Sequence, residues 1–258
     1  MTIRVLVNGA QGRMGQETVK AIKSTHDLVC VGTCGRDDDI IRCAEESQAQ
    51  VVVDFTTPSV VFNHCQRYID ASIHPVIGTT GLTSDQILTL QQAAQRKQLG
   101  GIIAPNFSIA VNLMIHFAAQ AVRYYPHAEI IEMHHQHKLD SPSGTAIKTA
   151  HKMAEARNLQ HSSSQVEINA ALKDPAHAEK NSARGALVSD FPIHAVRLPG
   201  IVAQQEIIFG GLGETLTIRQ DTLNREAFMP GVLLACRQVI HMTKVVYGLE
   251  HLLDLQTS

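Results

Sequence analysis

The feature that most restricts the fold of this chain is the regular alternation of apolar, β-branched runs with helical patterns over residues 1–105. The third run, VVVDF at Val51–Phe55, is apolar at nearly every position, which is typical of a parallel strand covered on both faces. Such alternation predicts an α/β fold with a doubly wound parallel sheet. The predicted strands are Ile3–Asn8, Leu28–Cys34, Val51–Phe55, Pro75–Gly78 and Gly101–Ala104, and the predicted helices are Gln16–Ile22, Pro58–Ala71 and Ser84–Lys97.

The pattern changes in the second half of the chain. Strand-like runs are separated there by Pro199-Gly200 and by the glycine-rich stretch 210–213, which are hairpin signals. We therefore expect an α+β domain with a mixed or antiparallel sheet, and a final helical segment. The expected helices are Ser108–Tyr125, Ala146–Arg157 and Arg225–Tyr247, and the expected strands are Glu129–Met133, Val166–Leu172, His194–Leu198, Val202–Phe209 and Glu214–Arg219.

Composition excludes several classes of protein. The chain has 258 residues, 44% of them hydrophobic and 18% charged, and a net charge of −2, which is typical of a soluble globular protein with ample core. No basic stripe suggests a nucleic-acid partner, and no apolar stretch approaches the roughly 18–20 residues that span a bilayer. The first residues do not resemble a signal peptide, and the five cysteines form no CxxC pair. These features predict a cytoplasmic protein with reduced cysteines.

A glycine-rich turn follows the first predicted strand and opens the first helix. Its sequence is NGAQGRMG, with Gly9, Gly12 and Gly15 in GxxGxxG spacing. Glycines let the backbone approach a pyrophosphate, which binds at the positive end of a helix. The turn therefore predicts nucleotide binding, the alternative being a plain tight turn. We expect the contacts to come from Gly9, Ala10, Gln11, Gly12, Arg13 and Met14.

The end of the second strand bears on the choice between NADH and NADPH. Binders of NAD usually carry an acid there for the ribose hydroxyls, whereas Cys34-Gly35-Arg36 has an arginine, which suits a 2′-phosphate. The sequence therefore favours NADPH slightly over NADH, with Arg36 as the reader of the phosphate. Two alternatives remain: Arg36 is a solvated loop residue, or one of the acids at 37–39 holds the ribose.

Two further stretches end predicted strands and point to the same cofactor. In open α/β sheets, ligands bind at the carboxyl ends of the strands. We therefore expect the nicotinamide end of the cofactor to contact residues that end the fourth and fifth strands or come directly after them. These are Gly78, Thr79, Thr80, Ala104, Pro105, Asn106 and Phe107.

The most unusual stretch is HHQHKLDSPSGTA, residues 134–146. It places His134, His135, His137 and Lys138 immediately before a turn and a helix whose first amide groups favour an anion. This combination predicts a carboxylate-bearing substrate, with a histidine or the lysine as proton donor. Zinc bound by the three histidines is an alternative, but no further ligand follows at metal-site spacing, and we predict no metal. A second alternative is a set of ordinary surface histidines.

Several motifs together resemble the dihydrodipicolinate reductase family of bacterial lysine and diaminopimelate biosynthesis. The most specific is EIIEMHHQHKLDSPSGTA, which contains the pattern HHxxK–PSGTA. The others, in order, are NGAQGRMGQ, VVVDFTTP, VIGTTG, APNFSIAVNLM and the long run from His194 to Val232. The resemblance covers nearly the whole chain.

The resemblance implies a Rossmann-type dinucleotide-binding domain at 1–107 and 220–258, and a substrate-binding domain at 108–219 whose sheet assembles a homotetramer. It implies reduction of 4-hydroxy-tetrahydrodipicolinate to tetrahydrodipicolinate by NADPH or NADH. By position, His134 corresponds to the catalytic proton donor or acceptor and Lys138 to a second proton donor. The residues that correspond to the holders of the dicarboxylate substrate are His135, Lys138, Gly144 and Thr145.

The chain departs from the family pattern at two other positions. Gly35 stands where many members have an acid, and Ser141 replaces a common alanine. Two other readings compete with this one: a different two-domain reductase, against which the HHxxK–PSGTA block argues, and a nucleotide sensor without turnover, against which the presence of both His134 and Lys138 argues.

Overall fold

The computed structural model describes residues 2–161 and 182–255. The chain divides into two compact units. Unit 1 comprises Met1–Ile109 and Arg225–Ser258, and unit 2 comprises Ala110–Asn224.

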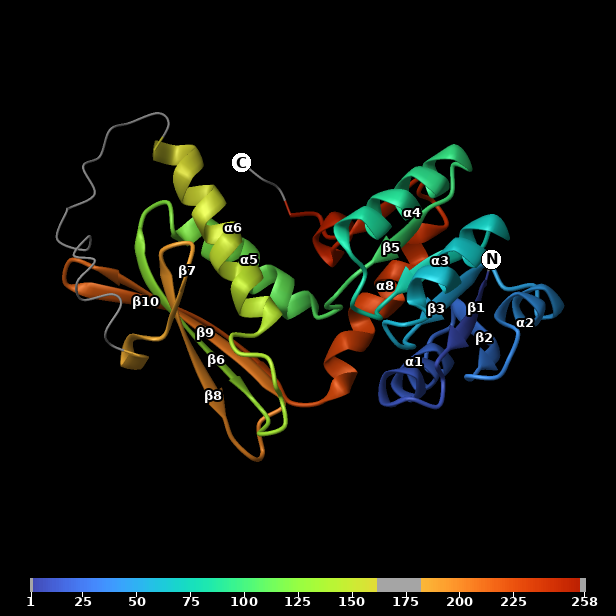
Figure 1. The fold of residues 1–258 in the computed structure, drawn as a ribbon, viewed down its shortest axis with the longest axis horizontal. Coiled ribbons are helices and arrows are strands. Elements are labelled where there is room, and N and C mark those ends of the chain that lie inside the picture. Colours follow the sequence, from blue (N-terminus) through green and yellow to red (C-terminus); the bar gives the residue numbers. More distant parts are fainter. Residues whose placement is uncertain (1, 162–181, 256–258) are drawn as a thin grey trace. The chain divides into compact units, whose positions relative to one another are not determined.

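Unit 1 alternates strands and helices along the chain (Figure 1). Its elements are β1 (Ile3–Asn8), α1 (Arg13–Lys23), β2 (Leu28–Cys34), α2 (Ile40–Glu46), β3 (Val51–Asp54), α3 (Val61–Asp70), β4 (His74–Ile77), α4 (Ser84–Arg96), β5 (Gly101–Ile103), the 3-10 helix η3 (Arg225–Phe228), α8 (Met229–Val239), β11 (Val245–Tyr247) and the 3-10 helix η4 (Leu249–Leu252).

The six strands of unit 1 form one sheet in the order β11-β5-β4-β3-β1-β2, and all neighbouring pairs are parallel. β1 pairs with β2 on one side and with β3 on the other, so the direction of winding reverses at β1. In open parallel sheets a ligand binds at such a point, beyond the carboxyl ends of the strands.

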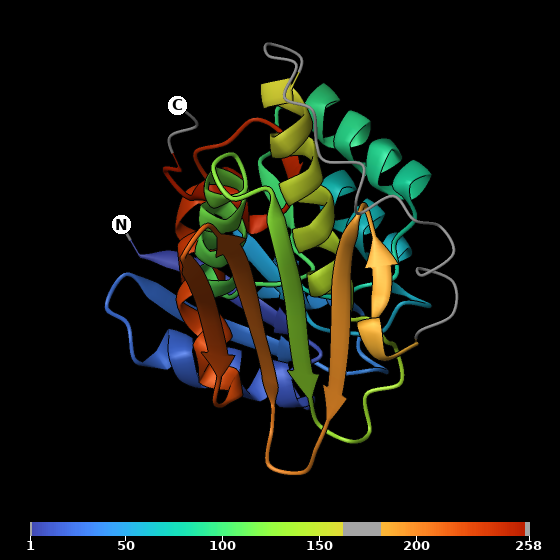
Figure 2. The same ribbon diagram turned by 90° about the vertical axis from the view of Figure 1, so that its left-hand side faces the viewer.

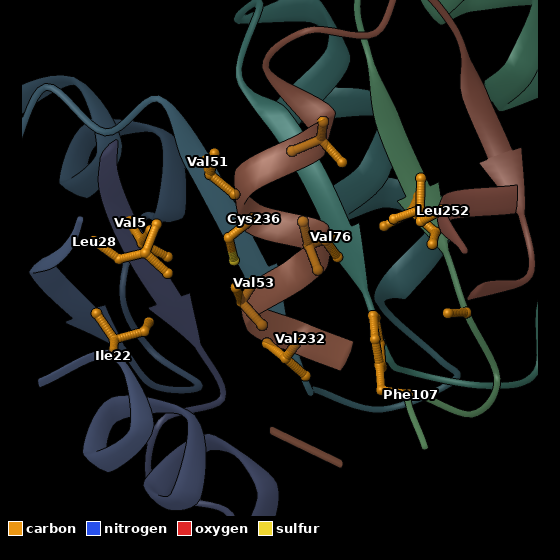
Figure 3. Close-up of a cluster of buried hydrophobic side chains, with 14 of the residues drawn as sticks. Val5, Ile22, Leu28, Val51, Val53, Val76, Phe107, Val232, Cys236 and Leu252 are labelled. Carbon is orange, nitrogen blue, oxygen red and sulfur yellow. The ribbon is translucent and has the colours of Figure 1, made fainter. Parts of the chain in front are cut away.

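Both faces of this sheet are buried, because successive side chains of a strand point to opposite faces. Val51 and Val53 pack in one apolar cluster with Val232 and Cys236 of α8 (Figure 3). Val52, between them, packs in a second cluster with residues of α2, α3 and α4. This explains why the third strand is apolar at consecutive positions, as the sequence predicts.

Unit 2 combines two long helices with a five-stranded sheet. Its elements are α5 (Ile109–Ala121), β6 (His127–His134), α6 (Gly144–His161), the 3-10 helix η2 (Ser182–Arg184), β7 (Ala186–Val188), β8 (Phe191–Arg197), β9 (Ala203–Gly211) and β10 (Glu214–Thr222).

The sheet of unit 2 has the strand order β10-β9-β6-β8-β7. β6 runs antiparallel to β9 and parallel to β8, so the sheet is mixed. α5 and α6 cover one face of it (Figures 1 and 2). Met114 of α5 and Met153 of α6 pack there against Ile130, Ile193 and Ile207 of the strands. The predicted fold class, a doubly wound parallel sheet plus an α+β part with a mixed sheet, is confirmed.

Four details of the fold differ from what the sequence predicts. The segment Arg225–Tyr247 is not one helix: α8 ends at Val239, and Val245–Tyr247 forms the edge strand β11 beside β5. The β-branched pair at 245–246 suits a strand, but its partner lies more than a hundred residues away in sequence. The short helix α2, capped by the side chain of Asp39 through the amide of Ile41, was not predicted.

The other two differences concern unit 2. The short strand β7 was missed, and α6 continues to His161 beyond its predicted end. The predicted strand at Val166–Leu172 lies outside the described residues. No helix in residues 2–161 or 182–255 is both long enough and apolar enough to cross a membrane.

Candidate functional site

The glycine-rich turn connects β1 to α1 at the point where the winding of the sheet reverses. Gly9 has φ +77°, and a Cβ atom there would lie 2.4 Å from the carbonyl oxygen of Phe55, so the turn requires glycine at this position. Gly12 is the N-cap of α1 and provides no side-chain cap. The first turn of α1 contains no acidic residue. The positive end of this helix is thus open to an anion.

A cleft of about 310 Å³ lies beside this turn. Its walls come from the carboxyl ends of three neighbouring strands, β1, β3 and β4, and from η3. Six of the predicted cofactor contacts line it: Gly12, Arg13, Met14, Gly78, Thr79 and Thr80. Four lining residues were not predicted: Phe55, Thr56, Pro58 and Arg225.

The missed residues differ in how far the sequence could have revealed them. Phe55 is the last residue of a predicted strand and Thr56 follows it directly, so the strand-end rule already pointed to them. Arg225 gave no local signal, because it reaches the cleft from a segment that returns to unit 1 after the whole of unit 2. Among the described residues, neither Arg13 nor Arg225 has an ion-pair partner.

The other predicted cofactor contacts do not line the cleft. Ala104 and Phe107 are buried, and the Phe107 ring meets the Phe55 ring edge-on with centroids 6.0 Å apart. Arg36 is exposed in the turn after β2. In the same turn the carboxylate of Asp38 accepts a hydrogen bond from the amide of Gly35 at 2.7 Å. Gly9, Ala10 and Gln11 form the first part of the glycine-rich turn.

A buried carboxylate connects the strand ends that form the cleft. Asp54, the last residue of β3, has no exposed surface. Its Oδ1 accepts hydrogen bonds from the Thr56 amide at 3.0 Å, the Thr56 hydroxyl at 2.6 Å and the Thr79 hydroxyl at 3.0 Å. Because Thr56 and Thr79 line the cleft, Asp54 positions two of its walls.

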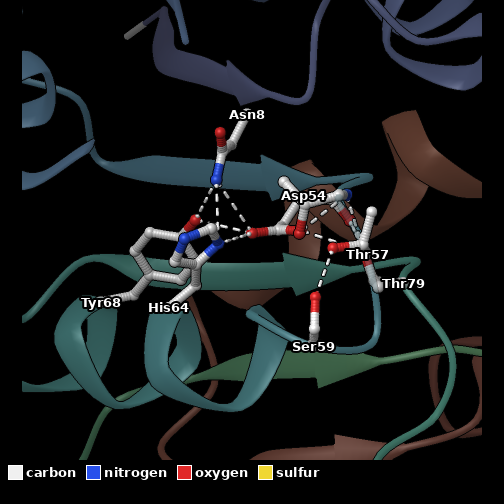
Figure 4. A network of polar contacts seen from close by, with 8 residues as sticks. Asn8, Asp54, Thr57, Ser59, His64, Tyr68 and Thr79 are labelled. Carbon is white, nitrogen blue, oxygen red and sulfur yellow. Dashed lines mark hydrogen bonds and ion pairs between the residues drawn. The ribbon is translucent and has the colours of Figure 1, made fainter. Parts of the chain in front are cut away.

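The second oxygen of Asp54 contacts β1 and α3 (Figure 4). Oδ2 accepts hydrogen bonds from Asn8 Nδ2 at 3.1 Å and from the Tyr68 hydroxyl at 2.7 Å, and lies 3.1 Å from His64 Nδ1. Burial acts to raise the pKa of Asp54, but the hydrogen bonds from His64, Thr56 and Tyr68 outweigh it and hold the pKa below its ordinary value. Asp54 is therefore ionised at neutral pH.

In unit 2, the histidine-rich stretch forms the loop between β6 and α6. β6 ends at His134, and the chain then turns, with the Lys138 amide donating to the His135 carbonyl at 3.1 Å. Lys138 Nζ pairs with Asp140 Oδ1 at 2.7 Å. The Ser143 hydroxyl accepts from the Ala146 amide at 3.2 Å and so caps α6. All the predicted catalytic and substrate-binding residues therefore lie at the end of β6, on this loop or in the first turn of α6.

Two residues at the base of this loop were not predicted. Glu132 of β6 is fully buried, and both of its oxygens accept hydrogen bonds from the Arg197 guanidinium, at 2.7 and 2.8 Å. His134 Nδ1 lies 2.6 Å from Glu132 Oε2. Burial acts to raise the pKa of Glu132, but His134 and Arg197 outweigh it and the pKa lies below its ordinary value. The sequence could not pair residues 65 positions apart.

The histidines do not form a metal site in the described part of the chain. His135 and His137 are exposed, with ring centroids 6.3 Å apart, while His134 turns toward Glu132. Within residues 2–161 and 182–255, no three His, Cys, Asp or Glu side chains are grouped as metal ligands would be.

Fold and site together define a class of protein. A parallel sheet with a glycine-rich turn and a cleft at its carboxyl edge is a Rossmann-type nucleotide-binding unit. Joined to a mixed-sheet unit with a titratable loop, it belongs to the two-domain, nicotinamide-dependent oxidoreductases.

Comparison with known proteins identifies the family. Family models described as dihydrodipicolinate reductase, N-terminus and C-terminus, match residues 3–107 and 110–253. The 4-hydroxy-tetrahydrodipicolinate reductase of Coxiella burnetii (strain RSA 493 / Nine Mile phase I) is 45% identical over 253 residues, covering 98% of this chain and 100% of that protein. The enzyme of the same name from Moorella thermoacetica is 42% identical, covering 98% of each.

Comparison with solved structures points to the same family. A dipicolinate-bound dihydrodipicolinate reductase from Paenisporosarcina sp. TG-14 has a TM-score of 0.85 at 38% identity, covering 98% of this chain and 100% of that one. An amine dehydrogenase from Mycobacterium smegmatis, at a TM-score of 0.63 and 12% identity, shares the fold alone. The chain belongs to the dihydrodipicolinate reductase family, and the predicted class of enzyme, a nicotinamide-dependent oxidoreductase, is confirmed.

Proposed function

We propose that this chain reduces 4-hydroxy-tetrahydrodipicolinate to tetrahydrodipicolinate with NADPH or NADH, in lysine and diaminopimelate biosynthesis. The relatives named for this reaction match it over nearly their whole length. The observation that carries the proposal is the β6–α6 loop, which brings His134, Lys138 and a helix N-terminus together within twelve residues of chain.

The residues of unit 1 fit a nicotinamide dinucleotide. The glycine-rich turn and the uncapped start of α1 suit the pyrophosphate, and Arg13 and Arg225 add two cations to the cleft wall. Gly78, Thr79 and Thr80, with residues 104–107, would hold the nicotinamide end. When bound, the reduced nicotinamide supplies a hydride.

We assign the substrate's carboxylates to His135, Lys138, Gly144 and Thr145. A Cβ atom added to Gly144 would meet nothing within 4 Å, so the protein itself does not require glycine there. Close approach of a ligand to the first amides of α6 supplies a reason for it. Lys138 Nζ, now paired with the exposed Asp140 at 2.7 Å, would exchange that partner for a substrate carboxylate.

The net reaction adds a hydride and a proton and releases water. Negative charge builds toward the ring nitrogen as hydride arrives at a conjugated ring carbon, so a nearby acid or cation lowers the barrier. We assign His134 as the proton donor or acceptor and Lys138 as a second proton donor. The Lys138 ammonium also stabilises the developing charge.

The surroundings of Arg36 support a slight preference for NADPH. β2 ends without an acid, Asp38 is bound to the Gly35 amide, and Asp39 caps α2 and pairs with Arg67 at 2.6 Å. Two of the acids that could hold ribose hydroxyls are thus engaged. We expect Arg36→Ala to raise the KM for NADPH more than that for NADH. Equal KM values for the two cofactors in the wild type would contradict the preference.

We also propose that the protein is a homotetramer assembled through the sheet of unit 2. No described element of unit 2 covers the face opposite α5 and α6 (Figure 2). Half-buried Ile131, Met133 and Ile208 alternate along β6 and β9 with residues of the core, and so point to that face. A second copy would cover them. Light scattering coupled to size exclusion tests this, and a monomer at micromolar concentration would contradict it.

The function is tested by following oxidation of NADPH or NADH while the upstream synthase makes the substrate from pyruvate and aspartate semialdehyde. We expect activity in the wild type and a loss of kcat of about 10²- to 10⁴-fold in His134→Gln and in Lys138→Ala. His194→Gln is the matched control, since His194 also pairs with a glutamate of β6. Lack of activity with both cofactors would contradict the function, and full activity of both variants would contradict the assigned roles.

Gly144→Ala tests the carboxylate site without disturbing the fold. Because the added methyl group meets open space, we expect unchanged thermal stability. A substrate that approaches the helix start would collide with it, so we expect the substrate KM to rise at least about tenfold, a loss of roughly 1.4 kcal/mol of binding. An unchanged KM would show that the substrate's carboxylates do not bind at the start of α6.

A further inference from the structure

Glu132 lies beneath the active-site loop and is bound from three directions. Its two oxygens receive paired hydrogen bonds from Arg197 of β8, at 2.7 and 2.8 Å. Oε1 also accepts from the Ser143 amide at 3.1 Å, where α6 begins. Oε2 lies 2.6 Å from His134 Nδ1. One buried carboxylate thus joins the ends of β6 and β8 to the start of α6.

Strand geometry explains how these groups meet. Glu132 and His134 are two residues apart on β6, so their side chains share one face. β8 runs parallel beside β6 with Arg197 in register with His134, which places the guanidinium against the same face. The spacing of Glu132 and His134 on β6, together with the register between β6 and β8, therefore brings the three side chains together.

The charge state of Glu132 determines which ring nitrogen of His134 holds a hydrogen. The paired guanidinium of Arg197 keeps the carboxylate ionised, and an ionised carboxylate can only accept hydrogen bonds. His134 Nδ1, at 2.6 Å, must therefore donate. In the described part of the chain, His134 Nε2 has no hydrogen-bond partner and remains free for a substrate.

We propose that Glu132 is a positioning residue for the reduction: it holds His134 with hydrogen on Nδ1, so that Nε2 is the atom that passes a proton to and from the substrate. This rests on the proposed function, in which His134 handles that proton. Arg197 serves as the counter-ion that keeps Glu132 an acceptor. Its Nη2 also donates to the Asp140 carbonyl at 2.7 Å, which fixes the loop that carries Lys138.

A second Glu–His–Arg group on the same strand shows that the residue types alone do not suffice. Glu129 pairs with His194 Nε2 at 2.7 Å and with Arg184, but its side chain is 37% exposed and lies at the opposite end of β6 from the loop. There the carboxylate meets Nε2, the reverse of the arrangement at His134. Glu129 is therefore the natural control for Glu132.

The first test reads the hydrogen position directly in the unaltered protein. Crystals are exchanged into deuterium oxide at a pH of about 8.5, well above the ordinary pKa of histidine, and neutron diffraction locates the deuterium atoms on His134. We expect deuterium on Nδ1, directed at Glu132. Its absence from Nδ1 overturns the proposal, whatever any variant does.

The second test asks whether Glu132 acts through His134. We expect Glu132→Gln to lower kcat about 10- to 100-fold, by analogy with partners that orient metal-binding histidines, with the substrate KM within about threefold of the wild type. In a His134→Gln background the same change should lower kcat less than about twofold. An equal loss of kcat in both backgrounds overturns the proposal, because it would show that Glu132 has a structural role that does not depend on His134. Glu129→Gln should stay within about twofold of the wild type.

The two tests separate this proposal from the function on which it rests. If His134→Gln keeps full kcat while deuterium is found on Nδ1, the assignment of His134 as proton carrier fails and the catalytic part of the proposal falls with it. If His134→Gln lowers kcat but deuterium is absent from Nδ1, the function stands and the positioning role of Glu132 is wrong.

Discussion

Asp54 in unit 1 and Glu132 in unit 2 are both fully buried carboxylates in the last three residues of a strand, yet they are stabilised in different ways. Asp54 accepts hydrogen bonds from neutral hydroxyl and amide groups and lies beside His64. Glu132 faces a guanidinium that binds both of its oxygens. In both cases the pKa lies below its ordinary value although burial acts to raise it.

The difference corresponds to what each site has to do. Neutral donors from β1, from α3 and from the residues that follow β3 and β4 hold Asp54 in place beneath the walls of the cleft. A cation beside Glu132 keeps that carboxylate ionised while it contacts a histidine that we expect to gain and lose a proton. The same functional group thus serves as a fixed brace in one unit and as an electrostatic partner in the other.

The largest effect on stability should come from Asp54→Asn. The substitution places an amide N–H₂ against groups that donate to Asp54, and several buried donors lose their partner. We expect the free energy of unfolding to fall by about 3–4 kcal/mol, measured by urea denaturation. Asp70→Asn, at the exposed end of helix α3, is the control and should change it by less than about 0.5 kcal/mol. Similar losses of unfolding free energy in the two variants would show that Asp54 does not stabilise the fold as a structural brace.

Arg197→Met should have the next largest effect, about 2–3 kcal/mol, because it leaves Glu132 buried with less compensation while Arg197 itself is 20% exposed. A second substitution tests whether this loss comes from the uncompensated charge of Glu132. Adding Glu132→Met should restore much of the lost stability, since the uncompensated charge is removed with it. A double variant that is less stable than Arg197→Met alone would show that Glu132 is held by more than its counter-ion.

Acid should destabilise the protein through both carboxylates. Each has a folded pKa below its unfolded value of about 4, so each contributes stability that is fully present above that pH and is lost as the pH falls through the folded pKa. Below about pH 4, Asp54→Asn should therefore show a slope of unfolding free energy against pH that is shallower by up to about 1.4 kcal/mol per pH unit. An unchanged slope would mean that Asp54 is not ionised in the folded protein.

The smallest effect should come from Glu129→Gln. Its partners His194 and Arg184 are the same residue types that meet Glu132, but the Glu129 side chain is 37% exposed, and ion pairs that are open to solvent contribute little. We expect a change in unfolding free energy of less than about 1 kcal/mol, measured by urea denaturation. A loss as large as that of Arg197→Met would show that residue type, rather than burial, decides the energetics.

Much of the candidate site could be read from local sequence. The glycine-rich turn, the residues after β4 and the histidine-rich loop were all visible as strand ends followed by turns, and six of the predicted contacts line the cleft. The partners of Glu132 could not be predicted from the sequence, because the groups that donate hydrogen bonds to it belong to the distant residues Ser143 and Arg197. Arg225 and the strand β11 were missed for the same reason.

By itself, the sequence determined the class of fold, because runs of β-branched residues and helical periodicity are local properties that depend on side-chain shape and spacing. It also determined the family, through motifs that extend over the whole chain. The tertiary structure alone decided which groups meet: Asn8, His64 and Tyr68 around Asp54, and Arg197 against Glu132 and His134. Such contacts depend on strand order and register, which bring residues distant in sequence to one face of a sheet. Whether a buried carboxylate is ionised depends on these contacts, and therefore cannot be predicted from a local sequence pattern.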